Sequence, residues 1–290
     1  MNKEKTIKAG QIAKQVKSYA KTIIKKDASL LEIAEKIEGK IIELGGKLAF
    51  PINLSMNNIA AHYTPSYNDE TKAQGLLKVD IGVHVDGYIA DTAFSLDLEG
   101  SDTNKKLIEA AEKALEAAEK TIKENIEASE VGKAIQKIIE NYGFSPIINL
   151  CGHEMKQYDL HAGLTIPNIK DQKEGIIKNG LYAIEPFATT GSGRVHDGKP
   201  SGIYHLKNEK NVRSQTAREV LAFIIKEYKT LPFCSRWIFK KFGAKGLFAL
   251  KELEDNDVLY HYPQLVEKEG SKVSQAENTI LIDKEKIITT

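Results

Sequence analysis

Two aspartates stand on what the sequence predicts to be one β-hairpin. Asp86-Gly87, the dipeptide that a type I′ turn favours, separates two apolar, β-branched runs within residues 79–94. Counted outward from that turn, Gly82 faces Asp91, and Asp80 shares the face of Gly82, so the two carboxylates are diagonal neighbours roughly 7–8 Å apart at the backbone. Such a pair repels unless a cation lies between its members, and hard divalent ions take oxygen ligands of this kind. Two solvated aspartates on an open sheet face are the alternative for this pair taken alone.

Three further titratable residues stand in apolar surroundings in the second half of the chain. His153 follows the strand-like residues 145–151, Glu185 interrupts a buried run, and Glu277 directly precedes the apolar residues 278–282. A carboxylate on a buried strand costs free energy unless it is paired or bound to a metal. Each of the three, taken singly, also fits a strand end or a sheet edge. Together with the two aspartates they form an oxygen-rich set that suits two Mn, Fe, Co or Zn ions.

Other catalytic motifs can be excluded. The stretch from His153 to Gln157 is not the H-E-x-x-H motif, because Gln157 stands where the second histidine is needed. Residues 191–194 lack the Gly-Lys-Ser/Thr sequence of a phosphate loop, and no G-x-S-x-G nucleophile motif occurs. Cys151 lies close to His153, but a buried structural thiol is favoured over a nucleophile. The metal-binding hypothesis is the one that remains.

The composition is that of an ordinary soluble globular protein. Of 290 residues, 41% are hydrophobic and 28% are charged, and a net charge of +1 points to neither nucleic acid nor an anionic membrane. No apolar run approaches the roughly 20 residues of a membrane span, and no signal peptide is evident. The two cysteines are far apart in the sequence and fit a reducing compartment. We expect a cytoplasmic protein with neither DNA nor a membrane as partner.

Long helices and strands succeed one another in both halves of the chain. Helical periodicity predicts helices over residues 4–26, 29–44, 102–127 and 129–141, the last with Ser129 as N-cap, and over 214–254, most clearly at 213–228. Besides the hairpin, strands are expected over residues 145–151, 179–189 and 278–282, and a short strand with loops over 49–65. This order suggests two similar α+β halves in one domain, residues 1–290, without a linker.

The first helix is rich in lysine. A solvated face is the favoured interpretation of residues 4–26, and an anionic partner such as ribosomal RNA is the alternative. A transient ribosome contact therefore stays open.

Five stretches of the chain, taken in order, resemble the type II methionine aminopeptidases, the archaeal and eukaryotic branch of that family. They are residues 49–65, 79–94, 152–163, 183–187 and 275–282. The segment between Glu185 and Glu277 resembles the helical insertion that marks type II enzymes, here at about residues 207–272. The resemblance implies a pita-bread fold, in which two pseudo-symmetric halves surround a curved antiparallel sheet.

The resemblance also assigns roles to single residues. By motif position, the ligands of two divalent metal ions would be Asp80, Asp91, His153, Glu185 and Glu277, with Asp91 and Glu277 bridging both ions. His62 and His161 match the histidines that contact substrate and stabilise the transition state, and Glu185 would also move the proton. The pocket for the methionine side chain would be formed by Phe50, Leu160, Ile203 and Tyr262. The sequence departs from the common family pattern at Asn278, often His, and at Cys151, often Asn.

The implied activity is removal of the N-terminal methionine from nascent polypeptides. A hydroxide that bridges the metals would attack the first peptide bond, the free amino group would bind near Asp80, and a small second residue would be preferred. A monomer is expected. The alternatives are an X-Pro dipeptidase or aminopeptidase P, which share fold and ligands, and a ribosome- or RNA-binding relative that has lost its ligands. The intact ligand set argues against the last.

Overall fold

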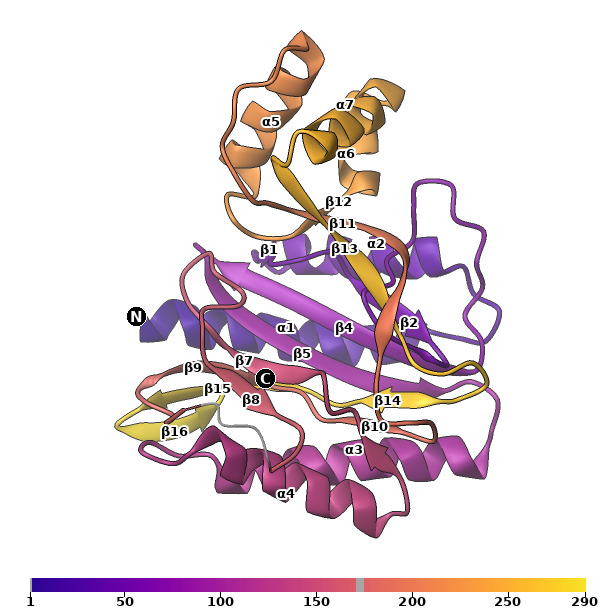
Figure 1. Cartoon of the computed structure of the whole chain (residues 1–290), viewed down its shortest axis with the longest axis vertical. Helices are drawn as coiled ribbons and strands as arrows, with labels where there is room; N and C mark the ends of the chain where they lie inside the picture. Colours follow the sequence, from indigo (N-terminus) through magenta and orange to yellow (C-terminus); the bar gives the residue numbers. More distant parts are fainter. Residues whose placement is uncertain (1, 171–174) are drawn as a thin grey trace.

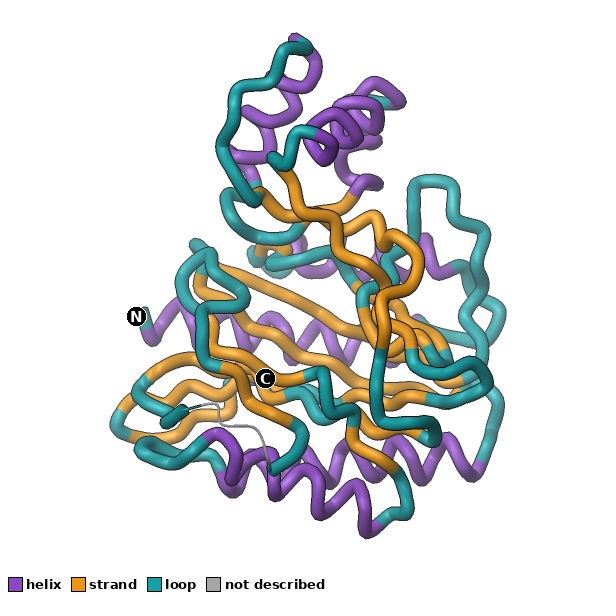
Figure 2. Tube along the Cα trace, in the orientation of Figure 1, coloured by secondary structure: helices purple, strands orange, loops and turns teal. Residues whose placement is uncertain are grey.

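The computed structural model describes residues 2–170 and 175–290, and it places long antiparallel strands at the centre with helices outside them (Figures 1 and 2). The first half of the chain consists of α1 (Lys3–Ile23), α2 (Leu30–Glu43), β1 (Lys47–Leu48), β2 (Asn53–Met56), β3 (Ile59–Ala61), β4 (Leu76–Val85) and β5 (Tyr88–Asp97). Helices α1 and α2 pack with β4 and β5 around one hydrophobic core. This half carries the predicted aspartate pair.

The predicted hairpin is present with the predicted register. Gly82 pairs with Asp91 in the ladder between β4 and β5. Asp86 and Gly87 have φ angles of 51° and 80°, and a type I′ turn requires positive φ at both of its central residues. The hairpin prediction is therefore confirmed. It could be made from the sequence because its signal is local: the turn dipeptide and the alternation of the strands together fix the pairing.

The second half repeats the plan with a helix pair on a second core. Its elements are α3 (Asp102–Thr121), α4 (Ala128–Asn141), β6 (Ser145–Pro146), β7 (Cys151–Met155), β8 (Thr165–Pro167), β9 (Gly180–Ile184) and β10 (Phe187–Thr189). The core below the sheet is built from α3, α4, β9 and the late strand β15 (Asn278–Asp283). Two α+β halves were expected, and this arrangement has them.

Several predicted boundaries were wrong. Helix α3 ends at Thr121, not 127, because Ile122 is already extended and Asn125 turns the chain with positive φ. Helix α4 begins one residue before Ser129, which therefore does not cap it; the Ala128 N–H instead donates to the Gly175 carbonyl. A contact distant in sequence thus sets where this helix starts.

The strand expected over residues 145–151 is interrupted. β6 pairs with β10, whereas β7 pairs with β8 and β9, so the chain crosses between two sheets over residues 147–150. The predicted strand over 179–189 makes the same crossing: β9 ends before Glu185, and β10 begins after Pro186 in the other sheet. Glu185 therefore lies at a break between two sheets.

A helical group covers the upper end of the molecule (Figure 1). It contains β11 (His196–Leu206), α5 (Gln215–Glu227), β12 (Phe233–Cys234), α6 (Ser235–Phe242), α7 (Ala244–Asp255) and β13 (Leu259–Val266), and its helices have their own hydrophobic core. The fully buried Arg236 of α6 joins this group to α2, with hydrogen bonds of 2.7 and 2.8 Å to the two carboxylate oxygens of Glu38. Whether residues 207–272 form an insertion stays a prediction.

The chain ends in strands that return to the centre. β14 (Val273–Gln275) pairs with β10, β15 pairs with β9, and β16 (Glu285–Ile288) pairs with β15. β5 and β15 belong to different sheets and touch at the single-residue bridge between Ala93 and Glu277. We call this line of contact between β5 and β15 the seam. Across the described part of the chain, none of the helices has the length and apolarity to cross a membrane.

Candidate metal centre

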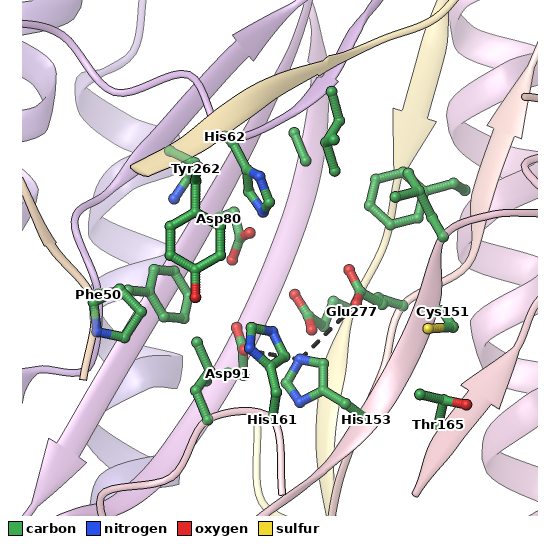
Figure 3. A pocket seen from close by; sticks show the side chains of 18 of the residues that line it. Phe50, His62, Asp80, Asp91, Cys151, His153, His161, Thr165, Tyr262 and Glu277 are labelled. Atoms are coloured by element: carbon green, nitrogen blue, oxygen red, sulfur yellow. Dashed lines mark ion pairs between the residues drawn. The ribbon is translucent and has the colours of Figure 1, made fainter. Parts of the chain in front are cut away.

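A cavity of about 380 Å³ opens beside the seam. Every residue that the sequence singled out for a site lines it: Phe50, His62, Asp80, Asp91, His153, Leu160, His161, Glu185, Ile203, Tyr262 and Glu277. In Figure 3 the labelled acidic side chains and the histidines converge on the middle of the cavity, with Phe50 and Tyr262 to one side. Residues more than 200 positions apart in the sequence therefore line one cavity.

The hairpin positions one part of the acidic cluster. Asp80 lies on β4 and Asp91 on β5, diagonal to each other across the ladder, and their carboxyl groups are within hydrogen-bonding reach. Gly82 on the same face leaves room for the apolar wall, since a Cβ at this position would lie 2.3 Å from Cε1 of Phe50. The absence of a side chain there allows carboxylates and an aromatic ring to share one cavity.

The other part of the cluster comes from the second half. His153 lies on β7, Glu185 at the break after β9, and Glu277 just before β15. Nε2 of His153 is 3.8 Å from Oδ2 of Asp91 and 3.9 Å from Oε1 of Glu185 (Figure 3). Ligand atoms of Asp91, His153 and Glu277 all lie within 4.8 Å of one another. These three residues could hold one metal ion together.

The carboxyl groups are in an environment that disfavours their charge. Burial raises the pKa of Asp80 to about 7, and burial followed by the charges of Asp80 and Glu185 raises the pKa of Asp91 well above its usual value. The pKa of Glu185 and that of Glu277 are raised in the same way, first by burial and then by the neighbouring carboxylates. Four acids crowded together in a buried cluster need positive charge to be ionised together.

Two of these acids also have an oxygen without a partner. Oδ1 of Asp80 and Oδ1 of Asp91 are buried and accept no hydrogen bond from any described residue. Buried polar atoms are nearly always satisfied, and a divalent cation is a partner that carboxylate oxygens accept. The donor set of four carboxylates and one imidazole fits such ions. The cluster therefore has the chemistry of a metal centre.

Two further histidines face the cluster as neutral rings. Burial lowers the pKa of His62 to about 4, and burial with the nearby His205 lowers that of His161. Nδ1 of His62 is 3.2 Å from the carbonyl oxygen of Pro263, which can only accept, so Nδ1 carries the proton and Nε2 is an acceptor. The His161 ring packs edge-on against that of His153, with centroids 4.5 Å apart.

Comparison with known proteins assigns the chain to a family. The sequence model of metallopeptidase family M24 matches residues 4–222. The chain belongs to metallopeptidase family M24. A methionine aminopeptidase of Pyrococcus horikoshii is 48% identical over 295 residues, a match that covers 100% of this chain and 99% of that protein.

Solved structures of this M24 fold superpose on the chain at low sequence identity. A thermophilic Arx1 has a TM-score of 0.86 at 16% identity, over 99% of this chain and 90% of that chain. A methionine aminopeptidase of Thermotoga maritima has a TM-score of 0.70 at 22% identity, over 99% and 95%. The expected pita-bread fold, metallopeptidase class and family are confirmed. The role of each single residue stays a prediction.

Sequence reasoning missed some residues of this M24 site. His205 holds the Tyr262 side chain, with Nδ1 2.8 Å from the phenol oxygen, and Lys17 reaches the seam from α1. Asn53 and Pro232 also line the cavity. Asn53 lies within the stretch 49–65 but was not singled out there, and no motif marked the other three. Lys17 nevertheless carries a usable signal: it recurs at helical spacing with Ala13 and Ala20, on the face that α1 buries.

Proposed function

We propose that this M24 metallopeptidase removes the N-terminal methionine from polypeptides whose second residue is small. The observation that carries the proposal is that one cavity is lined both by the acidic cluster and by the side chains of Phe50, Leu160, Ile203 and Tyr262. These four residues would form the pocket for the methionine side chain. A flexible thioether side chain suits an apolar pocket of irregular shape.

The metal ligands in this proposal are Asp80, Asp91, His153, Glu185 and Glu277. They would hold two divalent ions of the Mn, Fe, Co or Zn kind, with Asp91 and Glu277 shared. Such ions supply Lewis-acid polarisation of a carbonyl and lower the pKa of water. The protein's own groups must then orient the peptide and move protons.

Three residues have these tasks. Glu185 would take the proton of the attacking water and pass it to the leaving amine. His161 would donate a hydrogen bond to the carbonyl oxygen as negative charge develops there. For His62, whose Nδ1 donates to the Pro263 carbonyl and leaves Nε2 as an acceptor, we propose a contact with substrate: Nε2 would accept the N–H of the peptide and hold the chain in register.

The substrate's amino group would lie near Asp80 and so limit cleavage to a single residue. The substrates would be nascent polypeptides, so the protein would act in the cytoplasm. The proposal also includes a monomer, in which residues 207–272 form an insertion. A transient ribosome contact through α1 belongs to the same proposal, since Lys8, Lys14 and Lys21 are exposed on that helix.

Methionine release from the peptide Met-Ala-Ser tests the proposal. Protein stripped of metal should be inactive and should recover with Mn, Co or Fe, while Gly-Pro stays uncleaved and Met-Leu-Ser is cleaved at least 10-fold more slowly. Cleavage of Gly-Pro alone would make the protein an X-Pro dipeptidase. No cleavage of either peptide, with no metal bound, would favour a binding relative of the fold.

A further inference from the structure

Helix α1 places a lysine behind the metal ligands. Ala13 and Ala20 are fully buried against the sheet, and Lys17 lies between them on the same face. Its Nζ is 2.9 Å from Oγ1 of Thr92 and 3.4 Å from the carbonyl oxygen of Glu277. One ammonium group thus contacts both β5 and the residue that directly precedes β15.

The seam has few backbone bonds of its own. The backbone joins β5 to β15 through the bridge between Ala93 and Glu277, and side chains supply further contacts. Oγ1 of Thr279 accepts from the Asp91 N–H at 2.7 Å and donates to the Asp91 carbonyl at 2.8 Å. Oγ1 of Thr92 donates to the Glu277 carbonyl at 2.8 Å. The relative position of Asp91 and Glu277 therefore depends on side chains behind them.

Lys17 is the member of this group that reaches furthest. Besides Thr92 and Glu277, its Nζ lies 3.3 Å from Oδ1 of Asn278, whose Nδ2 donates to Glu119 of α3 at 2.7 Å. One lysine thus links α1, β5, β15 and, through Asn278, α3. A group with three acceptors on two strands restrains how far those strands can shift.

We propose that Lys17 is a positioning residue of the metal centre: it fixes Asp91 and Glu277 relative to each other and thereby sets metal affinity. The inference rests on the metal-binding function proposed above. Groups that hold ligands from behind typically change metal affinity 10–100-fold when removed. Lys17 is not among the residues that line the cavity, so its removal is expected to change metal affinity more than turnover.

The test is Mn²⁺ binding by the metal-stripped full-length protein, followed by calorimetry. In Lys17→Met, which keeps the length of the side chain without its donors, the Kd should rise about 10–100-fold. Lys14→Met, on the exposed side of the same helix, should bind as the parent does. At saturating Mn²⁺, kcat of Lys17→Met should recover to within a few-fold of the parent.

A second pair of variants guards against misfolding. Thr92→Val removes the hydroxyl that connects Lys17 to Glu277 and should weaken Mn²⁺ binding in the same direction, whereas Thr92→Ser keeps the hydroxyl and should not. If the parent, Lys17→Met and Thr92→Val bind Mn²⁺ with equal affinity, the inference about Lys17 is overturned and the proposed function still stands. A parent protein that binds no Mn²⁺ would instead overturn the proposed function.

Discussion

At the scale of single residues, the acidic cluster contains carboxylate oxygens that lack a hydrogen-bond partner among the described residues. Asp80 and Asp91 are buried with an oxygen that no described residue satisfies, and the pKa of each is raised by burial. Hydrogen bonds from Gln275 to Glu185 and Glu277, at 3.3 and 3.5 Å, are long and come from a neutral amide. A neutral amide does not compensate the negative charge of ionised carboxylates, whereas a bound divalent cation would.

His161 gives a prediction that separates catalysis from metal binding. Replacing it by Ala removes the proposed donor to the carbonyl oxygen, so kcat for Met-Ala-Ser should fall about 100-fold or more. The Kd for Mn²⁺, measured by calorimetry, should stay within a few-fold of the parent, since His161 is not among the proposed ligands. Parental turnover in His161→Ala would refute the assigned role.

At the scale of elements, the tip of the hairpin holds the loop that carries His161. The Tyr158 N–H donates to the Gly87 carbonyl at 2.9 Å, and a Cβ on Gly87 would lie 2.3 Å from the Tyr158 ring. From the other side, Lys229 lies 3.5 Å over that ring and Thr230 donates to the Tyr158 carbonyl. Leu160 and His161 follow within three residues. The turn therefore shapes the cavity wall as well as joining two strands.

Tyr158 is the variant that tests this contact. Tyr158→Ala should lower kcat/KM for Met-Ala-Ser about 10-fold or more, because small displacements of a catalytic group are costly. Tyr158→Phe keeps the ring and loses only the hydrogen bond to Asp86, 3.2 Å long and exposed, so it should remain near parental activity. If Tyr158→Ala keeps the parental kcat/KM, the tip does not position His161.

The elements also show which parts of this structure were predictable. The hairpin followed from Asp86-Gly87 and local alternation, and motif order singled out the residues that we propose as metal ligands. Strands β11 and β13 were not expected, because β11 begins with five exposed residues and has no apolar alternation there. Lys17 was taken for part of a solvated face, since its partners Thr92 and Glu277 lie 75 and 260 positions away. The spacing of Lys17 with Ala13 and Ala20 indicates the buried face of the helix, but no local pattern identifies partners so far away in the sequence.

At the scale of the whole molecule, buried histidines link stability to pH. Burial, with the charges of Lys47 and Lys229, lowers the pKa of His84 to about 4, and its Nδ1 accepts the Gly87 N–H at 3.0 Å. At a pH between this value and the ordinary pKa of about 6.5, His84 is protonated in the unfolded chain and neutral in the folded chain. The contribution of His84 is thus complete above about pH 6.5 and is lost as the pH falls toward 4.

His84→Gln should reduce this sensitivity while keeping an acceptor for the Gly87 N–H. In urea unfolding with a chelator present, the free energy of unfolding that the parent loses between pH 7.5 and 4.5 should exceed the loss in the variant by about 2.5 kcal/mol. An equal loss in both proteins would show that the protonation of His84 is not coupled to unfolding. Because the two losses are subtracted from each other, contributions from groups that titrate in both proteins cancel.

The seam joins the first helix to the last strands. A Cβ on Gly10 of α1 would lie 2.4 Å from the carbonyl oxygen of Thr289, and Lys17 contacts the Glu277 carbonyl 260 positions later. During synthesis, the ribosome releases α1 long before β15 exists. The face of α1 that packs against the last strands therefore stays uncovered until nearly all of the chain has been translated. The acidic cluster, which includes Glu277, is likewise incomplete until then.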